Sequence, residues 1–210
     1  MANPSQSRWS ELWQRLGGQG DGSVIYEDLF KRYHEPHRAY HNFAHIEQCL
    51  LEFGSLRSLA SNPDAIELAI WFHDAVYDTH AKDNEELSAE LAVDVMQSAA
   101  IPASLIQTVS NLILATKHAA MPADPDAALF VDVDLSILGQ SAEKFDEYEF
   151  QIRQEYNWVE SKAFIEGRSR ILEIFVKRPR IYSTECFHQK YENQARENLA
   201  RSIARLKTGV

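Results

Sequence analysis

Residues 71–79 read Trp71-Phe72-His73-Asp74-Ala75-Val76-Tyr77-Asp78-Thr79, and they follow the apolar run Ile66 to Ile70. Ile66, Ile70 and His73 recur at helical spacing, so His73 is expected to face the interior of a helical fold. An unpaired carboxylate is costly to bury, and the usual remedies are a cationic partner or a metal ion. The adjacent His73 and Asp74 therefore indicate a site where imidazole nitrogen and carboxylate oxygen bind a divalent metal.

Two further residues are expected to complete this metal site. His45 lies just after Asn42, which is a good N-cap, and so falls on the first turn of a predicted helix. Asp134 shares one helical side with Phe130 and Ile137. Asp132 lies about 200° round the helix from Asp134 and is expected to point elsewhere, although the two could exchange roles. The predicted ligands are His45, His73, Asp74 and Asp134.

The apolar spacing is helical along nearly the whole chain. Asn62-Pro63 is a strong helix start, and Gly17-Gly18 is a strong stop. Residues 130–134 alternate like a strand, but the spacing of Phe130, Ile137 and Leu138 before Gly139 favours a helix. The sequence predicts one all-α domain over residues 1–210, a bundle of about ten helices. Its metal-binding core would span about 40–138, with the C-terminal helices of residues 141–206 packed on it.

Inward-facing positions can also be predicted from the spacing. On the helix that opens at Asp83, Leu87, Leu91 and Val95 are expected inside. Ile171 is expected inside on the helix of residues 160–176. The stripe of Trp9 and Trp13 is expected to be core or an oligomer contact, which leaves a homodimer open.

The composition narrows the classes of partner. The 210 residues are 45% hydrophobic and 25% charged, as in ordinary globular proteins, and the net charge is -10. That charge argues against a broad surface for nucleic acid polymers or anionic membranes. It does not exclude a local basic pocket. The two cysteines, Cys49 and Cys186, and the absence of a signal-like start predict a cytoplasmic protein with reduced thiols.

The order of the candidate ligands resembles that of a known family. His45, then His73-Asp74, then the distant Asp134 is similar to the HD superfamily of metal-dependent phosphohydrolases. Tyr40-His41-Asn42-Phe43-Ala44-His45-Ile46 and Asp132-Val133-Asp134-Leu135-Ser136-Ile137-Leu138-Gly139 are similar to a bacterial branch usually called predicted HD superfamily metal-dependent phosphohydrolases. The resemblance implies an HD-domain-like bundle with a divalent metal at its centre. Water and a substrate phosphate would fill the remaining metal positions.

One position departs from the family. In the alarmone hydrolases and related 5′-deoxynucleotidases, a Glu stands three residues after the motif Asp, where this chain has Tyr77. Asp78 matches the next acidic position of the alarmone hydrolases and is the first candidate for the catalytic acid/base. Glu85, in the nearby loop, is the second candidate.

Several cationic or imidazole side chains could bind the phosphate of a substrate, because guanidinium and ammonium groups suit phosphate oxygens. Each alone is more often a surface charge, and His118 could instead be a histidine near a helix C-terminus. The candidates are Arg38, His41, Lys117, His118, Arg168 and Arg178.

The function expected from the resemblance is hydrolysis of a phosphomonoester or phosphoanhydride in a phosphorylated small molecule, most simply a nucleotide. The metal is left open among Mg, Mn, Zn, Ni, Co and Fe. Two rivals remain: an HD-fold di-iron oxygenase, and a non-catalytic regulatory module that binds metal or nucleotide. An oxygenase needs more His and carboxylate ligands than the four above. The regulatory module remains an alternative because Tyr77 stands where the related hydrolases have a Glu.

Overall fold

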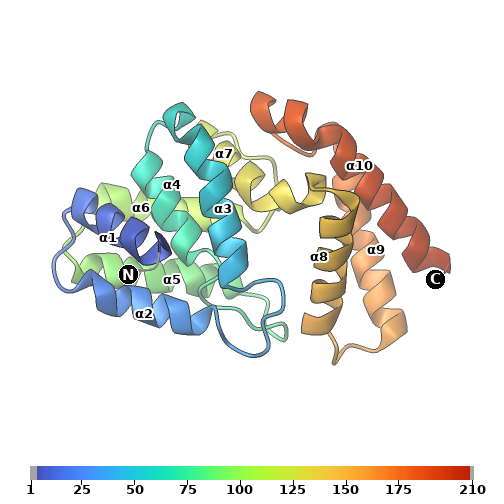
Figure 1. Cartoon of the computed structure of the whole chain (residues 1–210), viewed down its shortest axis with the longest axis horizontal. Helices are drawn as coiled ribbons and strands as arrows, with labels where there is room; N and C mark the ends of the chain where they lie inside the picture. Colours follow the sequence, from blue (N-terminus) through green and yellow to red (C-terminus); the bar gives the residue numbers. More distant parts are fainter. Residues whose placement is uncertain (1–3, 209–210) are drawn as a thin grey trace. The chain divides into compact units, whose positions relative to one another are not determined.

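The computed structural model describes residues 4–208 of the chain (Figure 1). In that range the regular elements are ten α-helices and two short 3-10 helices, which confirms the predicted all-α fold. The chain divides into two compact units, Met1–Val131 and Asp132–Val210, and each is described by itself. The prediction that residues 141–206 pack on the metal-binding core stays a prediction.

The first unit is built from α1 to α6, the short helix η1 and most of α7. Their bounds are α1 Pro4–Leu16, α2 Gly22–Arg32, α3 Phe43–Leu56, η1 Arg57–Leu59, α4 Pro63–Phe72, α5 Asn84–Ser98, α6 Ala103–Ala115 and α7 Pro125–Asp134.

The central element of this unit is α4, which packs against α1, α3, α5 and α6 (Figure 1). It begins as predicted: Asn62 accepts a hydrogen bond from the Ala65 amide, and Pro63 stands in the first turn. Every residue from Ala65 to Phe72 is buried, because the helix is apolar on nearly all sides. The polar exception is Glu67, which is also buried.

The side of α5 that faces the interior differs from the prediction. Leu87 is 38% exposed, and the buried residues of α5 are Ser88, Ala89, Ala92 and Met96. The prediction for Leu87 was therefore wrong by about one helical position. Small alanine side chains allow α5 to pack along α6, and this close approach outweighs the preference of leucine for burial.

The aromatic stripe of α1 belongs to the core of the first unit. Trp9 is fully buried and Trp13 nearly so, with their rings stacked 5.5 Å apart between centroids. The indole nitrogen of Trp9 donates to the Gly22 carbonyl at 2.6 Å. Homodimer formation stays a prediction.

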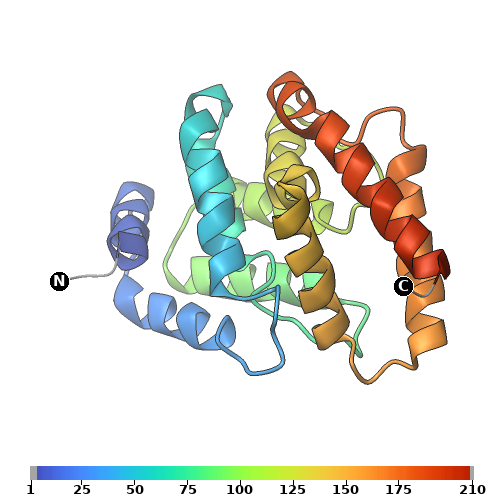
Figure 2. The same ribbon diagram turned by 45° about the vertical axis from the view of Figure 1, so that its right-hand side comes forward.

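The second unit contains the end of α7, the short helix η2 (Leu135–Gly139), α8 (Ala142–Glu155), α9 (Ser161–Lys177) and α10 (Glu185–Thr208). The long helix α10 packs against α9 and η2 (Figure 2). Ile171 on α9 is 47% exposed, so the prediction that it faces inward was wrong. The buried residues of α9 are Arg168, Leu172 and Phe175.

Buried hydrogen bonds fix η2 against the elements that follow it. The Tyr182 hydroxyl donates to the Leu135 carbonyl at 3.0 Å, and the Asn198 amide donates to the Leu138 carbonyl at 2.9 Å. Such bonds matter because an unpaired buried carbonyl costs free energy. Gly139 closes η2 at a point where α10 comes very near.

No helix in the described range 4–208 combines the length and the apolar character needed to cross a bilayer.

We expect Gly139→Ala to destabilise the protein by about 1–3 kcal/mol, as overpacking does. A Cβ at this position would lie 2.4 Å from the Tyr191 Cβ, which cannot rotate away from it. Gly167→Ala is the control, because its Cβ would meet no atom within 4 Å and alanine favours a helix. Urea unfolding measures both, and equal stabilities for the two variants would contradict the prediction.

Candidate metal centre

Three of the predicted ligands come together in the first unit. His45 lies on the first turn of α3, which Asn42 caps by accepting from the Ala44 amide at 2.9 Å. His73 is the C-cap of α4, and Asp74 follows it directly. Both histidines are buried, with His73 only 1% exposed, whereas the Asp74 side chain is 17% exposed. The cluster therefore has one half-buried carboxylate beside two buried imidazoles.

The spacing of the ligand atoms suits one metal ion. The Nε2 atoms of His45 and His73 lie 3.1 Å apart. The Asp74 Oδ2 lies 3.2 Å from His73 Nε2 and 3.6 Å from His45 Nε2. Two ligands that are each about 2.1 Å from an ion are about 3.0–3.6 Å apart at angles of about 90–118°. The residues present therefore fit a divalent ion as ligands on one side of it.

The hydrogen bond at the other ring nitrogen of His73 supports this arrangement. His73 Nδ1 lies 3.0 Å from the Ile70 carbonyl, which can only accept. This partner keeps a proton on Nδ1, so Nε2, which pairs with Asp74 when protonated, is the nitrogen that would bind a metal after losing its own proton. Metal-binding histidines usually have such a partner, which sets the tautomer and the ring orientation.

The charge of Asp74 is favoured by its neighbours. Burial raises the pKa of its carboxyl, but the charge and hydrogen bond of His73, with smaller effects of His41 and His45, lower the pKa by more. The net shift is downward, so Asp74 is an anion at neutral pH. An anionic oxygen beside two imidazoles is a donor set typical of divalent metals.

Arg38 holds the turn that carries Asp74. Its side chain is 0% exposed, and its Nη1 donates to the Asp74 carbonyl at 2.6 Å and to the His41 carbonyl at 3.0 Å. Its Nη2 donates to the Ala75 carbonyl at 3.2 Å, and its Nε donates to Glu35 at 3.0 Å. We call this set of bonds the Arg38 clamp. It joins the loop before α3 to the turn after α4, and the substrate-binding role predicted for Arg38 stays a prediction.

The loop after Asp74 is closed by hydrogen bonds to α5. The Ser88 hydroxyl, fully buried, accepts from the Val76 amide at 3.0 Å and lies 3.2 Å from the Val76 carbonyl. Asn84 accepts from the Asp78 amide at 3.0 Å and donates to its carbonyl at 2.9 Å. The Asp78 side chain is exposed and accepts from the His80 amide at 2.8 Å through Oδ1. This loop is therefore ordered around the first candidate for the acid/base.

A row of aromatic rings lies beside the cluster. The His41 ring stacks on the Tyr77 ring at 4.2 Å between centroids, and the Tyr40 ring is 4.9 Å from the His45 ring. Nε2 of His37 lies 2.9 Å from the Tyr77 carbonyl. His41, Tyr40 and Tyr77 are all half-buried. The sequence predicted His41 as a substrate-binding residue, whereas Tyr77 was identified only as a departure from the family pattern.

The two aspartates at the end of α7 belong to the second unit and differ in their surroundings. Asp132 is fully buried and accepts from the amides of Ser183 and Thr184 at 2.8 and 2.7 Å and from the Thr184 hydroxyl at 2.6 Å. Burial raises its pKa, although these hydrogen bonds lower it in part. Asp132 thus caps the start of α10. This position is compatible with the prediction that its side chain points away from that of Asp134. Asp134 is half-buried, and its ligand role stays a prediction.

The remaining first-unit candidates lie at the ends of α5 and α6. Lys117 forms a surface ion pair with Glu86, which raises the pKa of Lys117 and lowers that of Glu86. His118 is half-buried in a left-handed backbone conformation with φ 52°, three residues after α6 ends. Glu85, the second acid/base candidate, lies half-buried on the first turn of α5.

The two second-unit arginines have protein partners. The Arg168 Nε donates to Glu149 at 3.1 Å, and its guanidinium lies 5.1 Å from the Tyr148 ring. Arg178 is half-buried over the Phe175 ring, and burial lowers its pKa. Their binding of a substrate phosphate stays a prediction.

Comparison of this chain with protein-family models, with curated proteins and with solved structures gave no match.

We expect His73→Ala to lose its bound divalent metal while keeping most of its helix content, because the change removes a predicted ligand atom but none of the apolar side chains that bury α4. His34→Ala is the matched control, since His34 is an exposed histidine of the same unit. Elemental analysis of the purified variants measures the metal, and far-ultraviolet circular dichroism measures the helices. Full metal occupancy in His73→Ala would refute the assignment.

We expect Arg38→Lys to weaken metal binding about 10- to 100-fold, as the loss of groups that orient ligands does. An ammonium cannot reproduce the fork that holds two carbonyls of the turn. The same change in a half-buried arginine of α2, Arg32→Lys, should leave metal affinity unchanged. Metal titration followed by urea unfolding separates the two effects. A loss of stability with unchanged metal affinity would show that the clamp does not orient the ligands.

Proposed function

We propose that this chain is a divalent-metal phosphohydrolase of the HD type that acts on a phosphorylated small molecule, with a nucleotide as the preferred class. The observation that supports the proposal is the buried cluster of His45, His73 and Asp74, with ligand atoms 3.1–3.6 Å apart. The adjacent His-Asp pair and its order after His45 are those of the HD superfamily, as the sequence resemblance implies.

The reaction needs an activated water and a stabilised phosphate. A divalent ion supplies both when bound, because it lowers the pKa of a coordinated water and polarises a phosphoryl oxygen. We assign His45, His73 and Asp74 to hold the ion from one side. The other side of the ion is left to water and substrate. Asp134, which the sequence adds as a fourth ligand, belongs to the second unit and remains a proposal from the sequence.

Proton transfer is assigned to Asp78. Its carboxylate is exposed, lies four residues after Asp74, and uses Oδ1 to accept from the His80 amide. That hydrogen bond orients the side chain, and Oδ2 is the oxygen proposed to exchange a proton with water or with the leaving group. Tyr77 is unsuited to this task, since an unperturbed phenol titrates near pH ~10.

The preference for a nucleotide rests on the aromatic rings next to the ligands. His41 and Tyr77 stack on each other, and both are half-buried at the same end of the unit as Asp74. Half-buried flat rings beside the candidate ligands suit the flat base of a nucleotide, because stacking on aromatic side chains is favourable for any base. His41 is also a candidate partner for the phosphate.

We expect Asp78→Asn to keep its metal and to lose about 10²–10⁴-fold in turnover, the usual contribution of a general acid/base. Glu85→Gln should have a smaller effect, and Asp94→Asn, a change of an exposed acid on α5, should have none. Phosphate release from a panel of nucleotides and sugar phosphates gives the turnover, with metal content measured in parallel. Wild-type turnover in Asp78→Asn would show that Asp78 is not the general acid/base.

The same panel tests the class of reaction. Release of inorganic phosphate that depends on an added divalent ion would support hydrolysis. Two bound irons without phosphate release would favour an oxygenase. One bound ion with tight nucleotide binding and no turnover would favour a regulatory module.

A further inference from the structure

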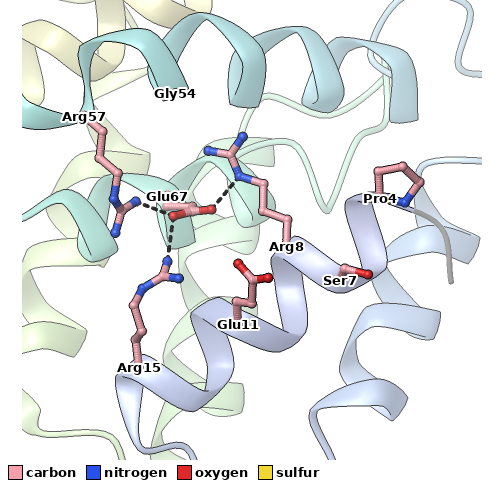
Figure 3. A pocket seen from close by; sticks show the side chains of 8 residues that line it. All are labelled: Pro4, Ser7, Arg8, Glu11, Arg15, Gly54, Arg57 and Glu67. Atoms are coloured by element: carbon pink, nitrogen blue, oxygen red, sulfur yellow. Dashed lines mark hydrogen bonds and ion pairs between the residues drawn. The ribbon is translucent and has the colours of Figure 1, made fainter.

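A second charged site lies in the first unit, around the buried carboxylate of Glu67 (Figure 3). An open pocket of about 500 Å³ is lined here by residues of α1 together with Gly54, Arg57 and Glu67. The Glu67 side chain is 2% exposed at the base of the pocket. Three arginines, Arg8, Arg15 and Arg57, surround it, and we call the space between them the arginine pocket.

The arginines meet on the same carboxylate. Arg8 Nε donates to Glu67 Oε1 at 2.6 Å, and Arg15 Nη2 donates to Glu67 Oε2 at 2.9 Å. Arg57 also pairs with Glu67 and with Asp64, and Arg15 Nε donates to Asp64 at 2.9 Å. Three guanidinium groups thus share two carboxylates. These five groups carry a net charge of +1, which the carboxylate of Glu11, also lining the pocket, balances.

The guanidinium groups retain unused donors that water can reach. Their side chains are 30–39% exposed, unlike Glu67 beneath them. Each guanidinium has five N–H donors. Among the described residues, neither Arg8 Nη2 nor Arg15 Nη1 has a hydrogen-bond acceptor. Arg8 is held in place by its Nη1, which donates to the Leu50 carbonyl at 2.8 Å. The donors are therefore held in position before a ligand binds, and this lowers the entropy cost of binding.

Glu11 is the feature of the pocket that opposes an anion. It is exposed on α1 on the side of Arg8 and Arg15 (Figure 3). Within residues 4–208 it forms no ion pair, so the arginines do not depend on it as a hydrogen-bond partner. Its charge should weaken, without preventing, the binding of an anion.

We propose that the arginine pocket binds a phosphate group, either free or as the phosphate monoester of a small molecule. Guanidinium groups match phosphate oxygens with paired hydrogen bonds, and three of them meet here around one space. A volume of about 500 Å³ has room for a ligand larger than phosphate itself. The site lies on a different set of residues from the metal centre and does not depend on the proposed phosphohydrolase activity.

The test is a calorimetric titration of the full chain with inorganic phosphate, at constant ionic strength and in excess EDTA. The chelator removes binding through a metal, so the result is independent of the proposed function. We expect saturable binding with a dissociation constant of about 1 mM or tighter. Arg15→Gln should weaken it about tenfold or more, because a charge-assisted hydrogen bond is lost. Arg32→Gln removes the same charge from an exposed pair on α2 and should change little.

A second variant acts in the opposite direction and has no ion pair to lose. Glu11→Gln should tighten phosphate binding about two- to fivefold, the size of a surface charge interaction. Glu27→Gln, an equal change at an exposed position of α2, is its control. The proposal is overturned if wild-type protein shows no saturable binding, or if Arg15→Gln and Glu11→Gln match their controls. Titration with glucose 6-phosphate then separates the two sources: binding tighter than that of phosphate indicates a monoester, and equal binding indicates the free ion.

Discussion

The hydrogen bonds from Arg38 to the carbonyls of Asp74 and Ala75 are the constraint on which the candidate metal centre depends. The apolar helix α4 ends at Phe72, and the two residues after it must turn away while remaining beside the core. Carbonyls buried in such a turn need donors. Arg38 supplies them from a loop that also leads into α3 and His45. One guanidinium thus fixes both halves of the ligand cluster.

Asp132, Asp74 and Glu67 have different partners, and these partners distinguish their roles. Asp132 accepts N–H and O–H groups at the start of α10, and burial raises its pKa. Asp74 faces imidazoles, and its pKa is lowered despite burial. Glu67 is surrounded by guanidinium groups. A carboxylate held by backbone amides serves the fold, whereas one beside imidazole nitrogens can serve a metal.

The candidate metal centre and the arginine pocket both use residues of α4 or its C-cap. Glu67 and His73 are six residues apart, which corresponds to about 9 Å along the helix and about 240° around it. The two charged groups therefore leave different faces of one apolar helix. This explains how a helix with such an apolar sequence can carry two polar clusters: each polar side chain is met by partners from a different neighbouring element.

The sequence by itself determined the helical class, most helix starts and the burial of His73. Asn42, Asn62 and Pro63 act within one turn of their own helices, so local chemistry is enough to place them. His73 and Asp74 could be predicted as candidate metal ligands because they are adjacent. Periodicity, however, defines a helix face only to within about one residue, and so Leu87 was placed inside where Ser88 is buried. Only the tertiary structure decided that the Arg38 side chain is enclosed by carbonyls, that Asp132 caps a helix about fifty residues away, and that three arginines meet on Glu67. These contacts join segments far apart in the chain, and their geometry follows from helix packing, which no local pattern of residues specifies.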